Sequence, residues 1–279
     1  MPALDDHPLR YTLNSELHAR PFPSLTAPHV AAYLAVRPLG EAARRDRSVD
    51  LQQLRDLLAH YGAPLPAEDA THYFGPMGKY TLKWEQHTEF VTYTVFLDQL
   101  GQRPFDPAEF DVFPQDWRAG LNAQRITSIL LRLVPRPPQD AQIAEALQDW
   151  FVPESLAVAS VLEDAAVIAS DFRIDPAGHM RMAIFASEGT GSRRLGRIVQ
   201  RLCEIETYKS MSMLGFAKVR EFAGQLDRID AELNDLMAGM AGTSAMAEDT
   251  LHRLLDISVG LEALSADASY RLGATEAYQ

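Results

Sequence analysis

The most regular hydrophobic pattern in the chain lies between Arg193 and Met240. From Val219 onward, apolar residues recur at alternating steps of three and four, at Val219, Phe222, Leu226, Ile229, Leu233, Leu236 and Met240. A second apolar run precedes this one, at Leu195, Ile198, Leu202 and Ile205. Such spacing is typical of paired helices, including coiled coils. A helix of this length exceeds the usual globular range, so we expect it to pack on a partner helix or another subunit.

A second helix is predicted from about Ala247 to the end of the chain. Its apolar positions are Leu251, Leu254, Ile257, Leu261 and Leu264. Because a glycine-containing break at 239–244 separates the two helices, they should form a long antiparallel hairpin. Neither a glycine cap nor a proline stop ends the second helix. We therefore expect the natural protein to continue beyond Gln279.

Shorter patterns before residue 189 predict strands and short helices. Strands are expected at 29–37, 79–85, 90–97, 126–134, 155–162, 165–174 and 179–187, and helices at 46–60 and 141–151. The strands at 79–85 and 90–97 should form a hairpin that turns near His87, and the last three a meander. The predicted class is α+β. A mostly antiparallel sheet domain with helices on one face, residues 1–188, precedes the helical hairpin, residues 189–279.

Composition narrows the possible functions. The 279 residues are 47% hydrophobic and 23% charged, which is ordinary for a globular protein. A net charge of −12 argues against nucleic acid as a partner and against general adhesion to anionic membranes. The single cysteine, Cys203, fits a reducing cytoplasm. We see no secretory signal, and no apolar stretch within these residues is long enough to cross a membrane.

The first candidate site lies in a proline-rich N-terminal arm that contains Glu16, His18 and Arg20. These three ionisable side chains could contribute to a pocket. They could equally pin the arm onto the domain by hydrogen bonds and ion pairs, and we favour this structural interpretation.

The second candidate site is Glu85, His87 and Glu89. Alternate residues of a strand share one face, so two carboxylates and an imidazole could converge on a divalent cation. The predicted turn falls within this string, however, and would separate the ligands. We therefore favour a solvent-exposed polar strand face, and assign no metal ligands and no cofactor.

The third candidate site is the glycine turn at 188–192, which precedes the long helix and has Arg193, Arg194 and Arg197 nearby. A helix N-terminus with nearby arginines favours an anion. The turn matches neither a P-loop nor a dinucleotide-binding motif. The alternative is a capping turn with Thr190 or Ser192 as the N-cap. Arg197 and Arg201 share a helix face, and they either pair with acids that set the helix register or remain solvated.

Four separated strings resemble one protein family. They are ELHARP at 16–21, KWEQHTEF at 83–90, GRIVQRL with EIETY at 196–208, and RLGAT at 271–275. Together they resemble a bacterial family of uncharacterised membrane-anchored proteins, domain of unknown function 3422. The resemblance implies a soluble domain on the cytoplasmic face of the inner membrane, held by a C-terminal membrane segment that is absent here. It implies no reaction.

We therefore expect a non-enzymatic interaction or sensing domain of a membrane-anchored homo-oligomer. Two alternatives remain open. One is a hydrolase-type enzyme that uses His18, Arg20 and His87, which a pocket joining these residues would favour. The other is the cytosolic domain of a divalent-cation transporter-like protein, which a ring with acids along its axis would favour.

Overall fold

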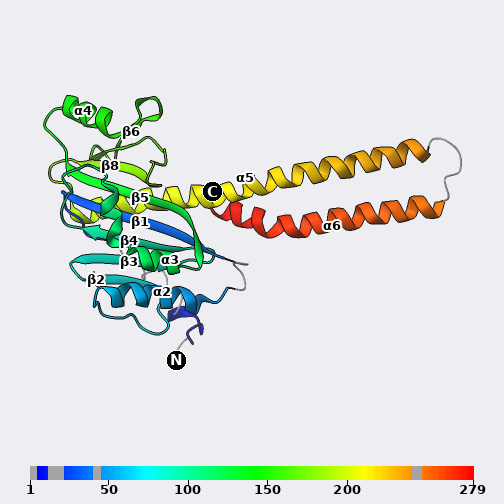
Figure 1. Cartoon of the computed structure of the whole chain (residues 1–279), viewed down its shortest axis with the longest axis horizontal. Coiled ribbons are helices and arrows are strands. Elements are labelled where there is room, and N and C mark those ends of the chain that lie inside the picture. The colour runs from blue at the N-terminus through cyan, green and yellow to red at the C-terminus, as the bar shows by residue number, and fades with distance from the viewer. Residues whose placement is uncertain (1–4, 12–21, 40–44, 241–246) are drawn as a thin grey trace. The chain divides into compact units, whose positions relative to one another are not determined.

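The computed structural model describes residues 5–11, 22–39, 45–240 and 247–279 (Figure 1). The chain divides into two compact units, Met1–Glu204 and Ile205–Gln279. The strands are β1 (His29–Pro38), β2 (His72–Met77), β3 (Tyr80–Gln86), β4 (Val91–Leu97), β5 (Ala123–Pro135), β6 (Ala157–Val161), β7 (Ala166–Ser170) and β8 (Met180–Ala186). The helices are α2 (Arg47–His60), η2 (Pro107–Val112), α3 (Gln115–Gly120), α4 (Asp140–Trp150), η3 (Pro153–Ser155), α5 (Ser192–Met240) and α6 (Ala247–Ala277).

The first unit is built on an eight-stranded sheet in the order β2-β3-β4-β1-β5-β8-β7-β6. Every neighbouring pair is antiparallel except β5 and β8, which are parallel. The predicted hairpin and meander are confirmed as β3–β4 and β6–β7–β8. The edge strand β2 was not predicted, because Gly75 and Pro76 interrupt its pattern.

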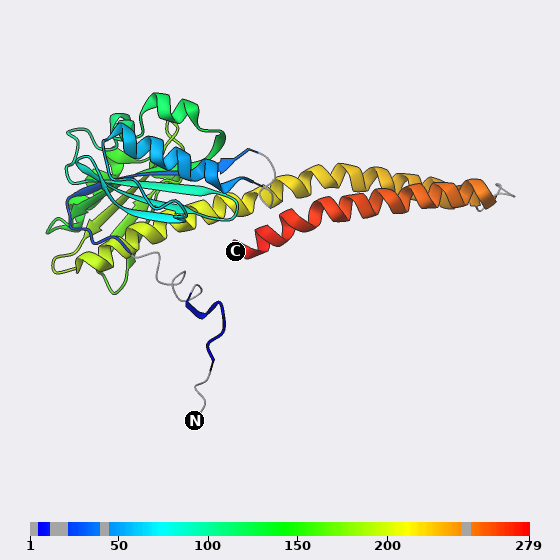
Figure 2. The same cartoon turned by 90° about the horizontal axis from the view of Figure 1, so that it is seen from below.

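The helices within residues 1–188 lie on one face of the sheet, as predicted, and the start of α5 covers the other face. On one face, α2, η2 and α4 pack over a core that includes Leu54, Trp84 and Leu130. On the other face, the start of α5 contributes Leu195 and Val199 to a second core. Figure 2 shows the sheet between α2 and α4 on one side and the start of α5 on the other. The first turns of the predicted hairpin helix therefore belong to the sheet unit.

Local sequence explains the boundaries of α2. The side chain of Asp46 accepts a hydrogen bond from the Ser48 backbone N–H at 2.9 Å, which caps the helix N-terminus. Gly62 follows the helix with φ +60°, a conformation that glycine adopts without steric cost.

The segment at 22–28 lies along the start of α5. The backbone N–H of Leu25 donates to the Ser192 carbonyl at 3.1 Å. The Pro23 carbonyl oxygen lies so close to Gly196 that a Cβ there would be 1.6 Å from it. Only glycine fits at this helical position, although glycine is otherwise unfavourable in a helix interior.

The second unit is a pair of antiparallel helices formed by α5 from Ile205 onward and by α6. The first residues of α5 in this unit meet residues late in α6: Gly215 lies so close to Thr275 that a Cβ on it would overlap the Thr275 side chain. Further along, a Cβ on Gly260 would lie 3.7 Å from Ile229 Cδ1, and Lys218 forms an ion pair of 2.8 Å with Asp267. Of the predicted break at 239–244, Gly239 and Met240 still belong to α5, and 241–244 lie outside the described residues. Among those described, no helix is both long and apolar enough to span a bilayer.

Two glycine-to-alanine substitutions in α5 should change stability in opposite directions. Gly196→Ala should lower the free energy of unfolding by about 1–3 kcal/mol, because the added methyl group overlaps the Pro23 carbonyl. Gly224→Ala should raise it by up to about 1 kcal/mol, because nothing lies within 4 Å of its Cβ position. Urea denaturation measures both changes in the free energy of unfolding. Each change is read from the unfolding transition of the unit that carries the residue. Equal stabilisation by both variants would contradict the close approach.

Candidate functional site

The first predicted site, Glu16, His18 and Arg20, lies outside the described residues. The neighbouring segment is described, and it is held at the start of α5 by polar and aromatic contacts. The hydroxyls of Ser24 and Ser192 are 2.7 Å apart, and the Arg197 guanidinium lies 4.8 Å from the centre of the Phe22 ring. A joint pocket of His18, Arg20 and His87 therefore remains a prediction.

The polar face of β3 is buried, and the favoured expectation of an exposed strand face is wrong. Lys83 is only 4% exposed, and Glu85 is also buried. The Lys83 ammonium lies 3.0 Å from Glu85 Oε2 and donates to Gln200 Oε1 at 2.7 Å. Gln200 in turn donates to Glu204 at 2.7 Å. The physical reason is that the start of α5 covers this face of the sheet, so strand and helix satisfy each other's polar groups.

His87 and Glu89 follow the end of β3 and do not continue its alternating face. The imidazole of His87 stacks on Phe90, with 4.3 Å between ring centres. Glu89 is buried. Across the described part of the chain, no three carboxylate, imidazole or thiol side chains are arranged to hold a metal ion.

A second buried charge lies on the opposite face of the sheet, where α2 packs. The Asp50 carboxylate forms an ion pair of 2.8 Å with Arg45 and accepts from the Gln86 amide at 2.8 Å. Burial raises the pKa of Asp50, and its effect outweighs the opposing charge of Arg45. Asp50 was not predicted, although a helical spacing of four and seven places it on the same face of α2 as Leu54 and Leu57.

The arginines of the predicted anion site do not converge, and Arg201 of the predicted register pair is exposed with them. Arg193, Arg194, Arg197 and Arg201 are all exposed, and Arg197 lies over Phe22. The Thr190 hydroxyl donates to the Ala165 carbonyl at 2.8 Å. The glycine turn is thus tied to the chain's own backbone.

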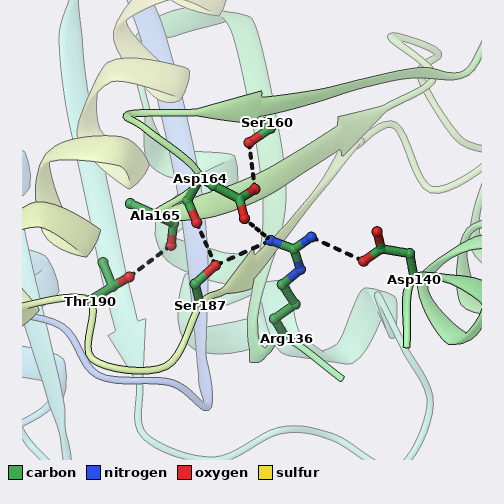
Figure 3. Close-up of polar contacts among 7 residues, drawn as sticks. All are labelled: Arg136, Asp140, Ser160, Asp164, Ala165, Ser187 and Thr190. Carbon is green, nitrogen blue, oxygen red and sulfur yellow. Dashed lines mark hydrogen bonds and ion pairs between the residues drawn. The ribbon is translucent and has the colours of Figure 1, made fainter. Parts of the chain in front are cut away.

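Figure 3 shows Arg136, which was not predicted, with its guanidinium donating to the Ser187 hydroxyl just before this turn. Its guanidinium donates to Asp164 at 2.8 Å and to Asp140 at 3.0 Å. Hydrogen bonds from the Ser160 hydroxyl and from Arg136 lower the pKa of Asp164. Leu162, Glu163 and Asp164 all have positive φ angles, between 53° and 64°. These contacts hold a turn that non-glycine residues adopt at a cost.

A buried hydroxyl–imidazole pair links β5 to the start of β8. The Ser128 hydroxyl donates to the Gly178 carbonyl at 3.0 Å, so the Nδ1–H of His179 must donate to Ser128 Oγ, also at 3.0 Å. The His179 ring packs on Phe110, with 4.1 Å between centres. Both Ser128 and His179 are buried, which indicates a structural rather than a nucleophilic pair.

The predicted apolar stripe of α5 divides into two lines in the structure. Phe222, Ile229 and Leu236, seven residues apart, face inward, and Leu236 is only 3% exposed. Val219, Leu226 and Leu233, also seven apart, are 49%, 48% and 36% exposed. The side chain of Met240 lies outside the described part. One apolar line therefore packs within the helix pair and the other faces solvent.

The exposed line continues onto α6. Ile257 is buried and Leu264 half-buried, while Leu254 and Leu261, three residues before them, are exposed. On α5 the exposed residues also lie three before the inward ones, a rotation of about 60° on both helices. Because the helices are antiparallel, this equal rotation turns both lines to the same side of the pair. We call this surface the apolar face: Val219, Leu226 and Leu233 of α5, with Leu254 and Leu261 of α6.

Comparison with known proteins identifies the family. The model of the family described as "Protein of unknown function (DUF3422)" matches residues 5–279. The chain belongs to the DUF3422 family. No curated protein and no solved structure matches it.

In this DUF3422 chain, the polar clusters are occupied by their own partners, whereas the apolar face is exposed. Arg136 contacts two carboxylates, and Lys83 contacts Glu85 and Gln200. Large exposed apolar surfaces on soluble proteins mark sites of association. The apolar face is therefore the best candidate functional site among the described residues.

The buried His179 should make stability depend on pH. Burial is the main cause that lowers its pKa below the ordinary 6.5; Arg125 and Arg118 lower it further, and Asp175 and Asp111 oppose them. In the unfolded chain His179 has its ordinary pKa and binds a proton more readily than in the native state. The native state should therefore lose stability as pH falls through about 6.5. His179→Gln should remove this part of the pH dependence.

Urea midpoints at pH 7.5 and 5.5 measure the effect, with exposed His60→Gln as the matched control. The wild type and the His60 variant should lose more stability over this interval than the His179 variant. An equal loss in all three proteins would contradict a buried neutral imidazole.

Proposed function

We propose that this chain is a protein-interaction module that acts on the cytosolic face of the inner membrane, within a membrane-anchored protein. It binds other protein surfaces through the apolar face of its helix pair. The observation that carries the proposal is the exposure of Val219, Leu226 and Leu233, which repeat every seven residues outside the core of the pair.

The energetics favour association. Burying the remaining exposed half of a leucine side chain contributes on the order of 1 kcal/mol. The apolar face places five such side chains on one surface, so a matching partner can gain several kcal/mol before the cost of association. A solvated helix pair without a binding role has no need for leucines at these positions, because polar residues with high helix propensity suffice there.

The contacts of the polar groups also favour binding over chemistry. The Lys83–Gln200 hydrogen bond and the Arg136 cluster join elements that are distant in sequence. Such clusters hold the sheet, α4 and the start of α5 together. Within the sheet unit they therefore stabilise the fold, and their polar groups are used in these contacts rather than in a reaction centre.

Membrane attachment rests on the family resemblance of the four strings at 16–21, 83–90, 196–208 and 271–275. Expressed from its natural gene, the protein should sediment with inner membranes and should be digested by protease only when the cytosolic face is accessible. Recovery in the soluble fraction, or digestion from the periplasmic side, would contradict the proposed location.

Photo-crosslinking in cells tests the interaction itself. With p-benzoylphenylalanine in place of Leu226, ultraviolet light should yield a protein adduct of higher mass. The matched control places the same group at Glu221, an exposed residue that pairs with Lys218. Adducts at neither position, or equally at both, would contradict an interaction through the apolar face.

A further inference from the structure

We propose that the apolar face binds the same face of a second copy of this chain, so that two helix pairs form a two-fold symmetric four-helix bundle. This inference rests on the proposed function, because it names the partner of the same surface. Identical surfaces brought together by a two-fold axis are the commonest arrangement in homodimers.

The size of the apolar face meets the requirement of a dimer. From Phe216 to Met237, both exposed, α5 rises about 32 Å, and two adjacent helices are about 20 Å wide. The face therefore offers about 600 Å² per copy, or about 1,200 Å² in total. This lies at the lower bound of stable specific interfaces and above ordinary packing contacts.

The side chains of the apolar face are complementary to a copy of themselves. Along α6, Leu254 and Leu261 lie seven residues apart on this face. The small residues Ser258 and Ser265, also seven apart, lie beside them, so large and small residues alternate. Along α5, Ala223 lies between Val219 and Leu226. Leucines of one copy can therefore pack over small residues of the other, as in interdigitated helix bundles.

The charge distribution favours an apolar partner. The opposite face of the helix pair carries the Lys218 contacts with Glu221 and Asp267. Within the apolar face of the described helices, helical spacing places one charged residue, Asp230. A strongly charged partner would find little to pair with here, whereas a second copy brings matching leucines. Asp230 then weakens the bundle and limits the registers in which it forms, as polar residues in helix seams do.

Sedimentation equilibrium of the purified 279-residue chain tests this inference. We expect a dimer of about 62 kDa, twice the 31.0 kDa of one chain. Leu226→Glu should raise the dissociation constant about tenfold or more, because it places a charge in an apolar interface. Leu226→Ser should weaken the dimer less. Asp230→Leu should strengthen it several-fold, because it removes the one charge from the face.

Val259→Glu is the matched control. Val259 is 68% exposed on α6 and lies two residues from the inward-facing Ile257, about 200° around the helix and away from the apolar face. This variant should dimerise like the wild type. Circular dichroism of each variant establishes that helix content is unchanged.

Three outcomes overturn the inference. They are a chain that stays monomeric at about 100 µM, a dimer that both glutamate variants weaken equally, and a dimer that neither variant weakens. A monomeric chain that is still crosslinked to a different protein through position 226 in cells also overturns it, and leaves the proposed function intact. A chain that crosslinks to nothing and is monomeric overturns both.

Discussion

The fold of the first unit depends on the burial of both faces of one sheet. The start of α5 closes the second face, and its approach to Pro23 requires the glycine at position 196. Closing that face removes Lys83 and Glu85 from water. A buried charge without a partner would cost several kcal/mol. The pairing of Lys83 with Glu85 and Gln200 is therefore a condition of the sheet being covered.

The second unit separates what is needed for folding from what is available for binding. A helix with one neighbour buries only about a third of its circumference. In α5, Phe222 and Leu236 are buried in the pair, whereas about half of Leu226 stays exposed. The sequence nevertheless repeats both lines of apolar residues in step. The exposed line repeats every seven residues, whereas the apolar residues of ordinary protein surfaces are scattered. This regularity indicates a binding surface.

Local patterns predict most elements of this chain, because caps, periodicity and turns act over a few residues. Asp46 and Gly62 mark the ends of α2, and the three–four spacing gives α5 its length. Contacts between distant segments are not encoded in this way. The burial of Lys83 depends on Gln200, and the Arg136 cluster joins residues 136, 164 and 187. The parallel pairing of β5 with β8 also depends on the whole sheet.

The same limit applies to the candidate site. Sequence spacing identified the apolar stripe of α5 but not its division, because only the position of α6 decides which residues turn inward. The predicted arginines at 193–201 share a stretch of helix, yet they point to solvent as separate charges. Asp50 could have been recognised, since a carboxylate on the apolar face of a short helix needs a buried partner.

The location of Cys203 has a practical consequence for labelling. It is the chain's only thiol, and it is buried in the core between the sheet and α5. Thiol-directed reagents need a solvent-accessible thiolate, so the native fold protects this sulfur from them. A cysteine introduced on the outer surface of α6 would then be the one position that a maleimide dye or spin probe modifies, without any change to the native cysteine.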